Sequence, residues 1–252
     1  MLAGKHALVT GGGTGIGAAI ALALAEAGAS VTITGRREEP LVDTQARSRG
    51  AMRWQIMDVT DEAAVIAGMA EAEAAAGPVD ILVANAGIAE TATVGRMSLA
   101  LWRKVQAANV EGVFLTMRAV IDGMAARGWG RIIAISSVAG LKGLRYGAAY
   151  SASKHAVLGL VKSASEEVLK QGVTVNALCP AYVATAIVAA NVEKVMARSG
   201  LEREEAEKFF AESNPFGRLI TPEEVAEAAI WLCGPGSGAV TGQAIPISGG
   251  QM

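Results

Sequence analysis

Tyr150 and Lys154 are the residues whose types and spacing point most directly to chemistry. They lie four positions apart in the segment Tyr150-Ser-Ala-Ser-Lys154, so on an α-helix their side chains share one face. A tyrosine phenol has a pKa of about 10, too high for ready proton exchange at neutral pH, and a nearby cation lowers it. The pair therefore predicts a general acid or base tuned toward physiological pH. An ordinary helix with an exposed lysine and an interfacial tyrosine would show the same spacing.

A cluster of glycines follows the first apolar run of the chain, residues 5–10, and opens a helical pattern over residues 14–27. Glycine lets the backbone turn sharply, and the free N–H groups of a helix start attract phosphate. We expect a pyrophosphate to bind at Gly11, Thr14, Gly15, Ile16 and Gly17. The spacing differs from the common GxGxxG pattern, and glycines can also serve a turn alone. The place of the cluster inside a strand–helix–strand unit favours the phosphate interpretation.

Two arginines, Arg36 and Arg37, come soon after the second predicted strand, residues 31–34. A site for NAD usually carries an acidic residue here for the 2′-hydroxyl of the ribose. Guanidinium groups instead suit a 2′-phosphate, which they bind through paired hydrogen bonds. The sequence therefore favours NADP over NAD as the cofactor. Glu38 and Glu39 follow at once, so a solvated charge cluster is the alternative.

Predicted strands and helices alternate along the chain. Further strands are predicted at residues 52–57, 79–84, 131–135, 173–177 and 244–247, and the proline in the last places it at a sheet edge. Further helices are predicted at residues 61–76 and 99–127, around Tyr150, and from Thr221 onward. This alternation predicts one α/β domain over residues 1–252, a doubly wound parallel sheet with helices on both faces.

Residues 182–214 depart from this alternation, because two helical segments follow each other without a strand between them. The first, residues 184–196, is apolar and rich in small side chains, and the second, residues 201–212, is strongly charged. An excursion of this kind beside the carboxyl edge of a sheet predicts a lid over a binding cleft. We expect the small residues 184–190 to line an apolar pocket, together with Leu144 and Tyr146.

The composition limits the partners and the compartment. The chain of 252 residues has a formal net charge of −2, without the clustered basic residues that nucleic acids require. Its two cysteines, Cys179 and Cys233, have no metal-ligand spacing and are interpreted as reduced, buried thiols. No segment resembles a secretion or anchoring signal, so we expect a cytoplasmic protein with no metal, nucleic-acid or membrane partner.

Together these residues resemble the short-chain dehydrogenase/reductase family over essentially the whole chain. The glycine turn at residues 10–17, an Asn-Ala-Gly segment at residues 85–87 and the Tyr150 pair occur in the family's order. Two more family positions look like Asn109, within a helix, and Ser137, thirteen residues before Tyr150. The resemblance implies a Rossmann-like oxidoreductase that transfers a hydride between a nicotinamide cofactor and a ketone or secondary alcohol.

The resemblance also implies roles for individual residues. Tyr150 would donate a proton to the carbonyl oxygen, Ser137 would hydrogen-bond that oxygen, and Lys154 would also reach the ribose hydroxyls. Asn109 would hold a water that relays protons to Lys154, although an asparagine within a helix can also bond locally. Ser136 is the rival of Ser137, but alternation along a strand would aim the two side chains oppositely. The further cofactor contacts implied are Asp58, Val59, Asn85, Ala86, Gly87, Pro180, Val183 and Thr185.

Local likenesses indicate the substrate class. Residues 214–250 look similar to β-ketoacyl-thioester and polyketide ketoreductases, and residues 179–182 to 3-hydroxybutyrate dehydrogenases. Both suggest a 3-oxoacyl or 3-hydroxyacyl compound, with another small secondary alcohol or a cyclic ketone as the alternative. At Pro180-Ala181 many family members have Pro-Gly, so the loop that borders the nicotinamide differs here.

Two other classes of function remain open. A non-redox enzyme of the same fold, such as a halohydrin dehalogenase, would be expected to lose Lys154 and the phosphate turn. A catalytically silent cofactor-binding protein would tolerate the loss of Ser137, Tyr150 or Lys154. This chain keeps all of these features. Family members commonly form dimers or tetramers, so the resemblance also implies a homo-oligomer.

Overall fold

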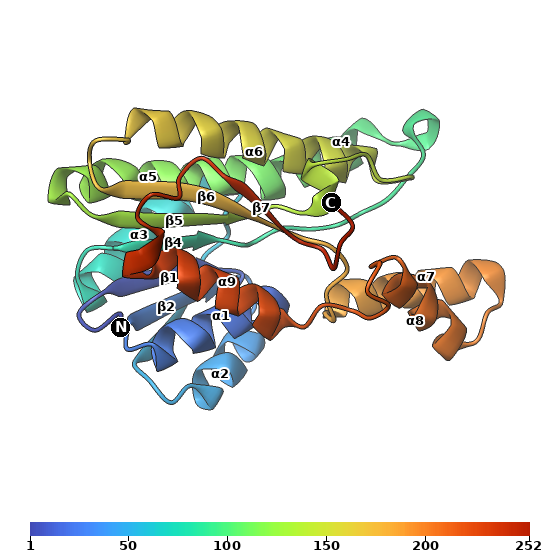
Figure 1. Ribbon diagram of the computed structural model, residues 1–252, viewed down its shortest axis with the longest axis horizontal. Coiled ribbons are helices and arrows are strands. Elements are labelled where there is room, and N and C mark those ends of the chain that lie inside the picture. The colour runs from blue at the N-terminus through green and yellow to red at the C-terminus, as the bar shows by residue number, and fades with distance from the viewer.

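Seven parallel strands form the sheet at the centre of the protein (Figure 1). The computed structural model describes residues 1–252, apart from the side chain of Arg198. The strands lie side by side in the order β3-β2-β1-β4-β5-β6-β7. They are β1 (His6–Thr10), β2 (Ser30–Gly35), β3 (Met52–Ile56), β4 (Ile81–Ala84), β5 (Gly130–Ile135), β6 (Val173–Pro180) and β7 (Ala244–Ile247). The prediction of a doubly wound parallel sheet is confirmed.

The direction of winding reverses between β1 and β4, which are neighbours in the sheet. From β1 the chain builds outward through β2 and β3, and it then returns to pair β4 with the other side of β1. Val9 pairs with Val83 in this register, so the segments that follow the two strands leave the sheet together. In open α/β sheets, ligands bind in the crevice at such a reversal.

The strands are buried according to their place in the sheet. Every residue of β4 and β5 is buried, because helices cover both faces of the sheet at these central positions. Strand β7 lies at one end of the order and contains Pro246. The prediction that this proline marks an edge strand is therefore confirmed.

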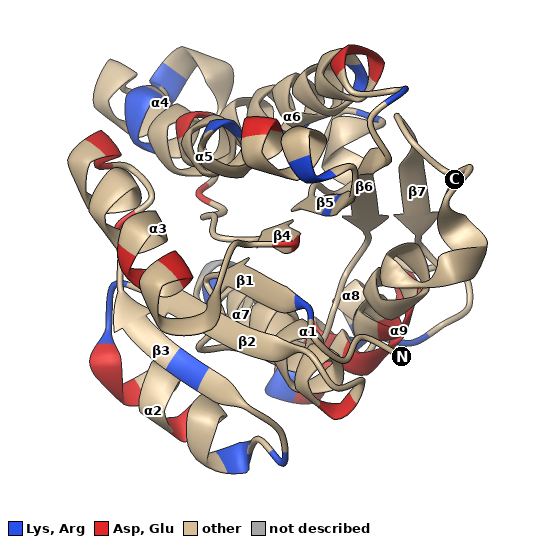
Figure 2. Cartoon of the chain, turned by 90° about the vertical axis from the view of Figure 1, so that its left-hand side faces the viewer, with Lys and Arg blue, Asp and Glu red and all other residues tan. Residues whose placement is uncertain are grey.

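Helices pack on both faces of the sheet, as Figure 2 shows with charged residues spread over the surrounding helices. One core joins the sheet to α3, α5 and α6, and a second joins it to α1, α2 and α9. These helices are α1 (Gly15–Glu26), α2 (Glu38–Arg47), α3 (Glu62–Ala76), α5 (Gly112–Arg127), α6 (Ala148–Glu167) and α9 (Pro222–Cys233). Among the described residues, no helix is both long and apolar enough to cross a membrane.

The structure corrects one prediction about a helix and adds one helix that the sequence did not predict. Residues 99–127 do not form one regular helix, because α4 (Leu99–Gln106) passes through a π-helical turn, η2 (Ala107–Glu111), before α5 begins. The turn contains Asn109, whose side chain is drawn to partners outside the helix. The sequence also does not predict α2, because only Leu41 and Thr44 of this polar segment are buried.

The excursion predicted as a lid forms two helices, α7 (Ala186–Ser199) and α8 (Arg203–Glu212), which stand away from the sheet in Figure 1. They have a small core of their own around Val192 and Phe210. The two ends of the excursion meet at a parallel bridge between Val183 and Ile220. We call this meeting point the neck of the lid. The side chain of Asn214 also joins its two sides, because it accepts from the N–H of Tyr182 at 3.2 Å and donates to the carbonyl of Tyr182 at 2.9 Å.

Candidate active site

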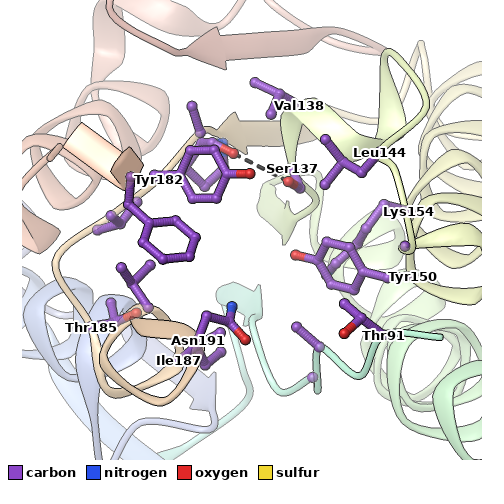
Figure 3. A pocket seen from close by; sticks show the side chains of 18 of the residues that line it. Thr91, Ser137, Val138, Leu144, Tyr150, Lys154, Tyr182, Thr185, Ile187 and Asn191 are labelled. Carbon is purple, nitrogen blue, oxygen red and sulfur yellow. Dashed lines mark hydrogen bonds between the residues drawn. The ribbon is translucent and has the colours of Figure 1, made fainter. Parts of the chain in front are cut away.

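A cavity of about 520 Å³ lies between the carboxyl ends of β4, β5 and β6 and the helices of the lid. It brings together most of the residues that the sequence predicts for catalysis (Figure 3). Its wall includes Asn85, Gly87, Ser137, Tyr150, Lys154, Pro180, Val183 and Thr185. The predictions that Leu144 and Tyr146 face the pocket are also confirmed.

Tyr150 and Lys154 lie in the first turns of α6, on the side that faces the cavity. The Lys154 ammonium nitrogen is 5.6 Å from the centroid of the Tyr150 ring, so the shared face predicted from their spacing is confirmed. Lys154 is only 4% exposed, and its Nζ donates a hydrogen bond of 2.7 Å to the carbonyl of Ile135 at the end of β5. The hydroxyl of Tyr150 points into the cavity in Figure 3.

The environment changes both pKa values, but not as the sequence predicts. Burial raises the pKa of Tyr150 above its ordinary value, and hydrogen bonding with the Ser137 hydroxyl opposes this effect. Burial lowers the pKa of Lys154 to about 8, against an opposing effect of Cys179. The expectation that Lys154 lowers the pKa of Tyr150 is therefore wrong for this arrangement, because desolvation of both groups dominates. A lysine with a pKa near neutrality can, however, accept and release protons at physiological pH.

Ser137 follows β5 and lies next to the hydroxyl of Tyr150 on the same wall of the cavity in Figure 3. Its Oγ donates to the carbonyl of Pro180 at 3.3 Å, a long contact that other acceptors can replace, and accepts from the N–H of Ala139 at 3.1 Å. Ser136, the rival candidate, instead donates its hydroxyl to the carbonyl of Lys154 at 3.1 Å. The two hydroxyls therefore point in different directions, as alternation along the strand predicts. The hydroxyl of Ser137 is directed at the cavity, and the hydroxyl of Ser136 bonds to α6.

Asn109 is fully buried in the π-helical turn, and its side chain joins two neighbouring segments. Its Oδ1 accepts from the N–H of Ile88 at 2.8 Å, and its Nδ2 donates to the carbonyl of Ile88 and to the Ser153 hydroxyl, both at 3.0 Å. The Ser153 hydroxyl in turn donates to the carbonyl of Tyr150 at 2.7 Å. Both amide hydrogens and one lone pair of Oδ1 are thus used, and the side chain holds the loop after β4 against α6.

The glycine turn after β1 has the form that a pyrophosphate requires. Gly11 has a φ of +65°, and a Cβ at Gly17 would collide with the carbonyl of Gly11 and the amide of Asn85. The first turn of α1 contains no acidic residue, and Thr14 makes no side-chain cap to its N–H groups. The positive end of the helix is therefore available to an anion, and these residues fit a dinucleotide.

The Asn-Ala-Gly segment after β4 supports this turn from the side. The Nδ2 of Asn85 donates to the carbonyls of Thr10 and Gly11 at 2.8 and 3.2 Å. The Thr10 hydroxyl accepts from the N–H groups of Asn85 and Ala86, both at 3.0 Å. A Cβ on Gly87 would lie 2.9 Å from Oδ1 of Asn109 and 3.7 Å from Nζ of Lys154, so the segment passes close to the catalytic group as well.

The predicted adenosine-side residues lie beyond the ends of β2 and β3. Arg36 and Arg37 are exposed, and no described carboxylate forms an ion pair with either. Glu38 and Glu39 lie in the first turn of α2, where acidic side chains interact favourably with the positive end of the helix dipole. Asp58 accepts hydrogen bonds from the N–H and hydroxyl of Thr60 at 3.0 and 2.8 Å, and the neighbouring Val59 is buried.

The lid meets the glycine turn, and its large residues shape the cavity. Thr185 lies against Gly15, where an added Cβ would come within 3.1 Å of the threonine methyl group. The expectation that residues 184–190 line the pocket is confirmed in part: Thr185, Ile187 and Val188 line it, but the four alanines of the segment do not. The lid contributes further cavity residues, namely Tyr182, Asn191, Lys194, Val195, Phe209 and Phe210. Packing between α7 and α8 sets the rotation of α7 about its own axis, and this rotation determines which of its side chains face the cavity.

A doubly wound sheet with a glycine turn at its reversal and a Ser137–Tyr150–Lys154 group beside it defines a class: dinucleotide-dependent oxidoreductases. A family model described as short chain dehydrogenase matches residues 5–195. The chain therefore belongs to the short chain dehydrogenase family, as its sequence predicts. It is an oxidoreductase that interconverts a ketone and a secondary alcohol with a nicotinamide cofactor.

Three similar proteins illustrate the range within this family. The inactive 2-(S)-hydroxypropyl-CoM dehydrogenase 2 of Xanthobacter autotrophicus is 39% identical over 216 residues, 85% of this chain and 92% of that protein. An acetoacetyl-CoA reductase of Rhizobium meliloti is 41% identical over 194 residues, 77% of this chain and 76% of that protein. A variant of the actinorhodin polyketide ketoreductase, solved with NADPH, superposes with a TM-score of 0.96 at 37% identity, covering 100% of this chain and 99% of that one.

Proposed function

We propose that this enzyme reduces the keto group of a 3-oxoacyl thioester to a 3-hydroxyacyl thioester with NADPH. The observation that carries the proposal is the pair of hydroxyls, from Ser137 and Tyr150, that lie next to each other on one wall of a largely apolar cavity. Support for the substrate comes from the similarity to an acetoacetyl-CoA reductase and to a polyketide ketoreductase. An acyl chain suits the aliphatic and aromatic lining, and the hydroxyls suit a carbonyl oxygen.

The residues divide the work of reduction among themselves. The nicotinamide, when bound, supplies the hydride. Ser137 gives up its long hydrogen bond to Pro180 and donates instead to the carbonyl oxygen, which stabilises the developing alkoxide. Tyr150 donates its phenolic proton to the same oxygen. The Lys154 ammonium, 5.6 Å from the centroid of the Tyr150 ring, places positive charge beside the phenolate that forms, and the phenolate then regains its proton from solvent.

The remaining predicted residues bind the cofactor or position the catalytic group. Asn109 acts by holding the loop of residues 85–88 against α6, which fixes the relative position of Lys154 and the cofactor site. The pyrophosphate binds at the start of α1, and Pro180, Val183 and Thr185 border the nicotinamide. Asp58 and Val59 border the adenine. Residues 1–252 act as one domain, in which residues 182–214 form the substrate lid.

Replacing Tyr150 by Phe tests the reaction. We expect turnover of acetoacetyl-CoA with NADPH to fall by about 10²- to 10⁴-fold, the usual contribution of a general acid, because the carbonyl oxygen loses its proton donor. The affinity for NADPH, measured by fluorescence titration, should change little. Tyr182→Phe is the matched control, since it removes another phenol that lines the cavity. Activity retained in Tyr150→Phe, or lost only in Tyr182→Phe, would refute the assignment.

The preference for NADP rests on Arg36 and Arg37, which are exposed beyond β2 without a carboxylate partner among the described side chains. The solved ketoreductase that this chain resembles contains NADPH, which supports the same choice. We expect Arg36→Ala to raise KM for NADPH about 10- to 100-fold, because a charge-assisted contact to the 2′-phosphate is lost. KM for NADH should change little. Arg49→Ala removes another exposed arginine as a control, and equal effects on the two cofactors would contradict the preference.

We further propose that the protein is a cytoplasmic homo-oligomer, a dimer or tetramer built through the helices that carry Asn109 and Tyr150. Apolar side chains exposed on α4 and α5 support the association, and the two free, buried cysteines suit a reducing compartment. Cell fractionation tests the compartment, and recovery with an envelope fraction would contradict it. The oligomer is tested at the scale of the whole molecule below.

A further inference from the structure

The charged side chains that line the cavity are all cationic. Among the described residues of its wall these are Arg145, Lys154 and Lys194, and no carboxylate accompanies them. Lys154 is buried beside Tyr150, whereas Arg145 and Lys194 are exposed. The two exposed cations come from different walls, one from the loop before α6 and the other from α7 of the lid. The entrance of the cavity therefore has positive charge on both sides.

Arg145 is held by an unusual loop. The next residue, Tyr146, has a φ of +66°, the one positive φ among the described non-glycine residues. Such a backbone is strained, and strain of this kind tends to occur at functional sites. The Tyr146 carbonyl accepts from the N–H of Ala92 at 2.9 Å, and the Arg145 guanidinium lies 4.8 Å from the centroid of the Tyr146 ring. The loop conformation and the stacking together restrict where the guanidinium can go.

Lys194 is on the face of α7 that lines the cavity. Asn191 lines the same cavity, and its spacing of three residues from Lys194 agrees with a common helical face. Neither Arg145 nor Lys194 forms an ion pair with any described carboxylate. By contrast, Arg203 and Lys208 of the lid are paired with glutamates. The charges at the entrance are thus available to a ligand.

We propose that Arg145 and Lys194 form an anion-binding rim that recognises the phosphate groups of the carrier of the substrate. This inference rests on the proposed function and adds to it the chemical class of the far end of the substrate. The acyl part fills the apolar cavity up to Ser137 and Tyr150, and the phosphate-bearing carrier remains at the entrance.

The apolar side chains of the cavity wall favour a substrate whose anionic group lies far from its keto group over one whose anionic group lies next to it. Ile88, Val138, Leu144, Ile187 and Val188 line the cavity together with the catalytic hydroxyls. A compound with a carboxylate next to its keto group would have to place that charge among these side chains, which is costly without a partner. A phosphate separated from the keto group by an apolar length reaches the two exposed cations without that cost.

The test compares two thioesters that share the reacting group. One is acetoacetyl-CoA, which carries phosphates, and the other is the neutral acetoacetyl thioester of N-acetylcysteamine. The measured quantity is the ratio of kcat/KM for the first to kcat/KM for the second, at saturating NADPH. In the double variant Arg145→Ala/Lys194→Ala we expect this ratio to fall about tenfold, since two exposed ion contacts together contribute on that order. The fall should come from KM for acetoacetyl-CoA.

The control removes two positive charges elsewhere. Lys170 and Lys208 are exposed and do not line the cavity, so Lys170→Ala/Lys208→Ala should keep the wild-type ratio. Added salt should lower the wild-type ratio toward that of the rim variant, because exposed charges are screened. An unchanged ratio in the rim variant, or an equal fall in the control, would overturn the rim while leaving the reductase intact. A wild-type enzyme that reduces neither thioester would overturn the proposed function and the rim together.

Discussion

His6 illustrates how burial alters one titratable side chain at a distance from the active site. It begins β1 and is 2% exposed, with Nδ1 2.7 Å from the carbonyl of Gly77 and Nε2 2.9 Å from the hydroxyl of Thr32. Burial lowers the pKa of His6, and the contact with Gly77 opposes this effect. The neutral ring therefore links β1 to β2 and to the segment before β4.

The lowered pKa of His6 predicts a pH-dependent stability. The unfolded chain binds a proton at His6 near its ordinary pKa of about 6.5, whereas the folded protein binds it only at lower pH. His6 should therefore make its full contribution to the free energy of unfolding above about pH 6.5, and this contribution should be lost as the pH falls below that value. For one proton the slope is at most about 1.4 kcal/mol per pH unit.

Urea unfolding of the wild type and of His6→Gln between pH 8 and pH 5.5 measures this slope. The variant should show a flatter dependence on pH, whatever its absolute stability. His155→Gln, which replaces an exposed histidine, should keep the wild-type slope. Parallel curves for the wild type and His6→Gln would show that His6 does not control the dependence.

The positions of the candidate catalytic residues could be predicted from the sequence where the signal is local. The spacing of Tyr150 and Lys154 is enough to place them on one face, because helical periodicity depends only on neighbours. Their pKa values could not be predicted in the same way. The groups that surround them, Ser137 and Cys179, come from other elements, and the extent of burial depends on the complete fold.

At the scale of elements, the sheet was predictable and the irregular segments were not. Apolar and β-branched runs mark the strands, and the capping box of Thr221 and Glu224 marks the start of α9. The π-helical turn at Asn109 has no comparable signal, because residues 99–127 keep a helical composition across it. Its cause is tertiary, since Asn109 bonds to Ile88 and Ser153. A π-helical turn inside an α-helix is often found at a functional site, as here.

The position of the lid was also predictable from the sequence, whereas the orientation of its helices was not. Two helical segments were predicted at residues 184–196 and 201–212, close to α7 and α8 as found. The side chains that line the cavity were predicted only in part, because α7 and α8 take their orientation from each other. Val188 and Val192 pack with Ala206 and Phe210, and this contact turns Asn191 and Lys194 toward the cavity. The sequence alone therefore located the two helical segments, but it did not show which of their side chains face the cavity.

At the scale of the whole molecule, several large apolar side chains are exposed on the helices on either side of Asn109. Leu99 and Trp102 on α4 and Phe114 on α5 are 59%, 38% and 43% exposed, although they are large and apolar. Side chains of this kind, gathered on neighbouring elements, are typical of association surfaces. They lie on the helices that the proposed oligomer would use.

Light scattering tests the oligomer. The wild type should have a mass that is a multiple of the 25.7 kDa chain, and Phe114→Glu should shift it toward the monomer, because a buried charge without a partner opposes association. Val42→Glu on α2, at a similar exposure of 39%, is the matched control and should keep the wild-type mass. A monomeric wild type would contradict the proposal outright.

The closed neck of the lid has a consequence for how such enzymes diversify. Because Val183 and Ile220 are bridged and Asn214 fastens the same point, the intervening segment enters and leaves the sheet at one place. Recombination could exchange that segment between homologues without disturbing the strands or the hydride-transfer machinery. A single scaffold could then acquire new selectivity in one genetic event, and a designer could graft a foreign loop at the same two positions.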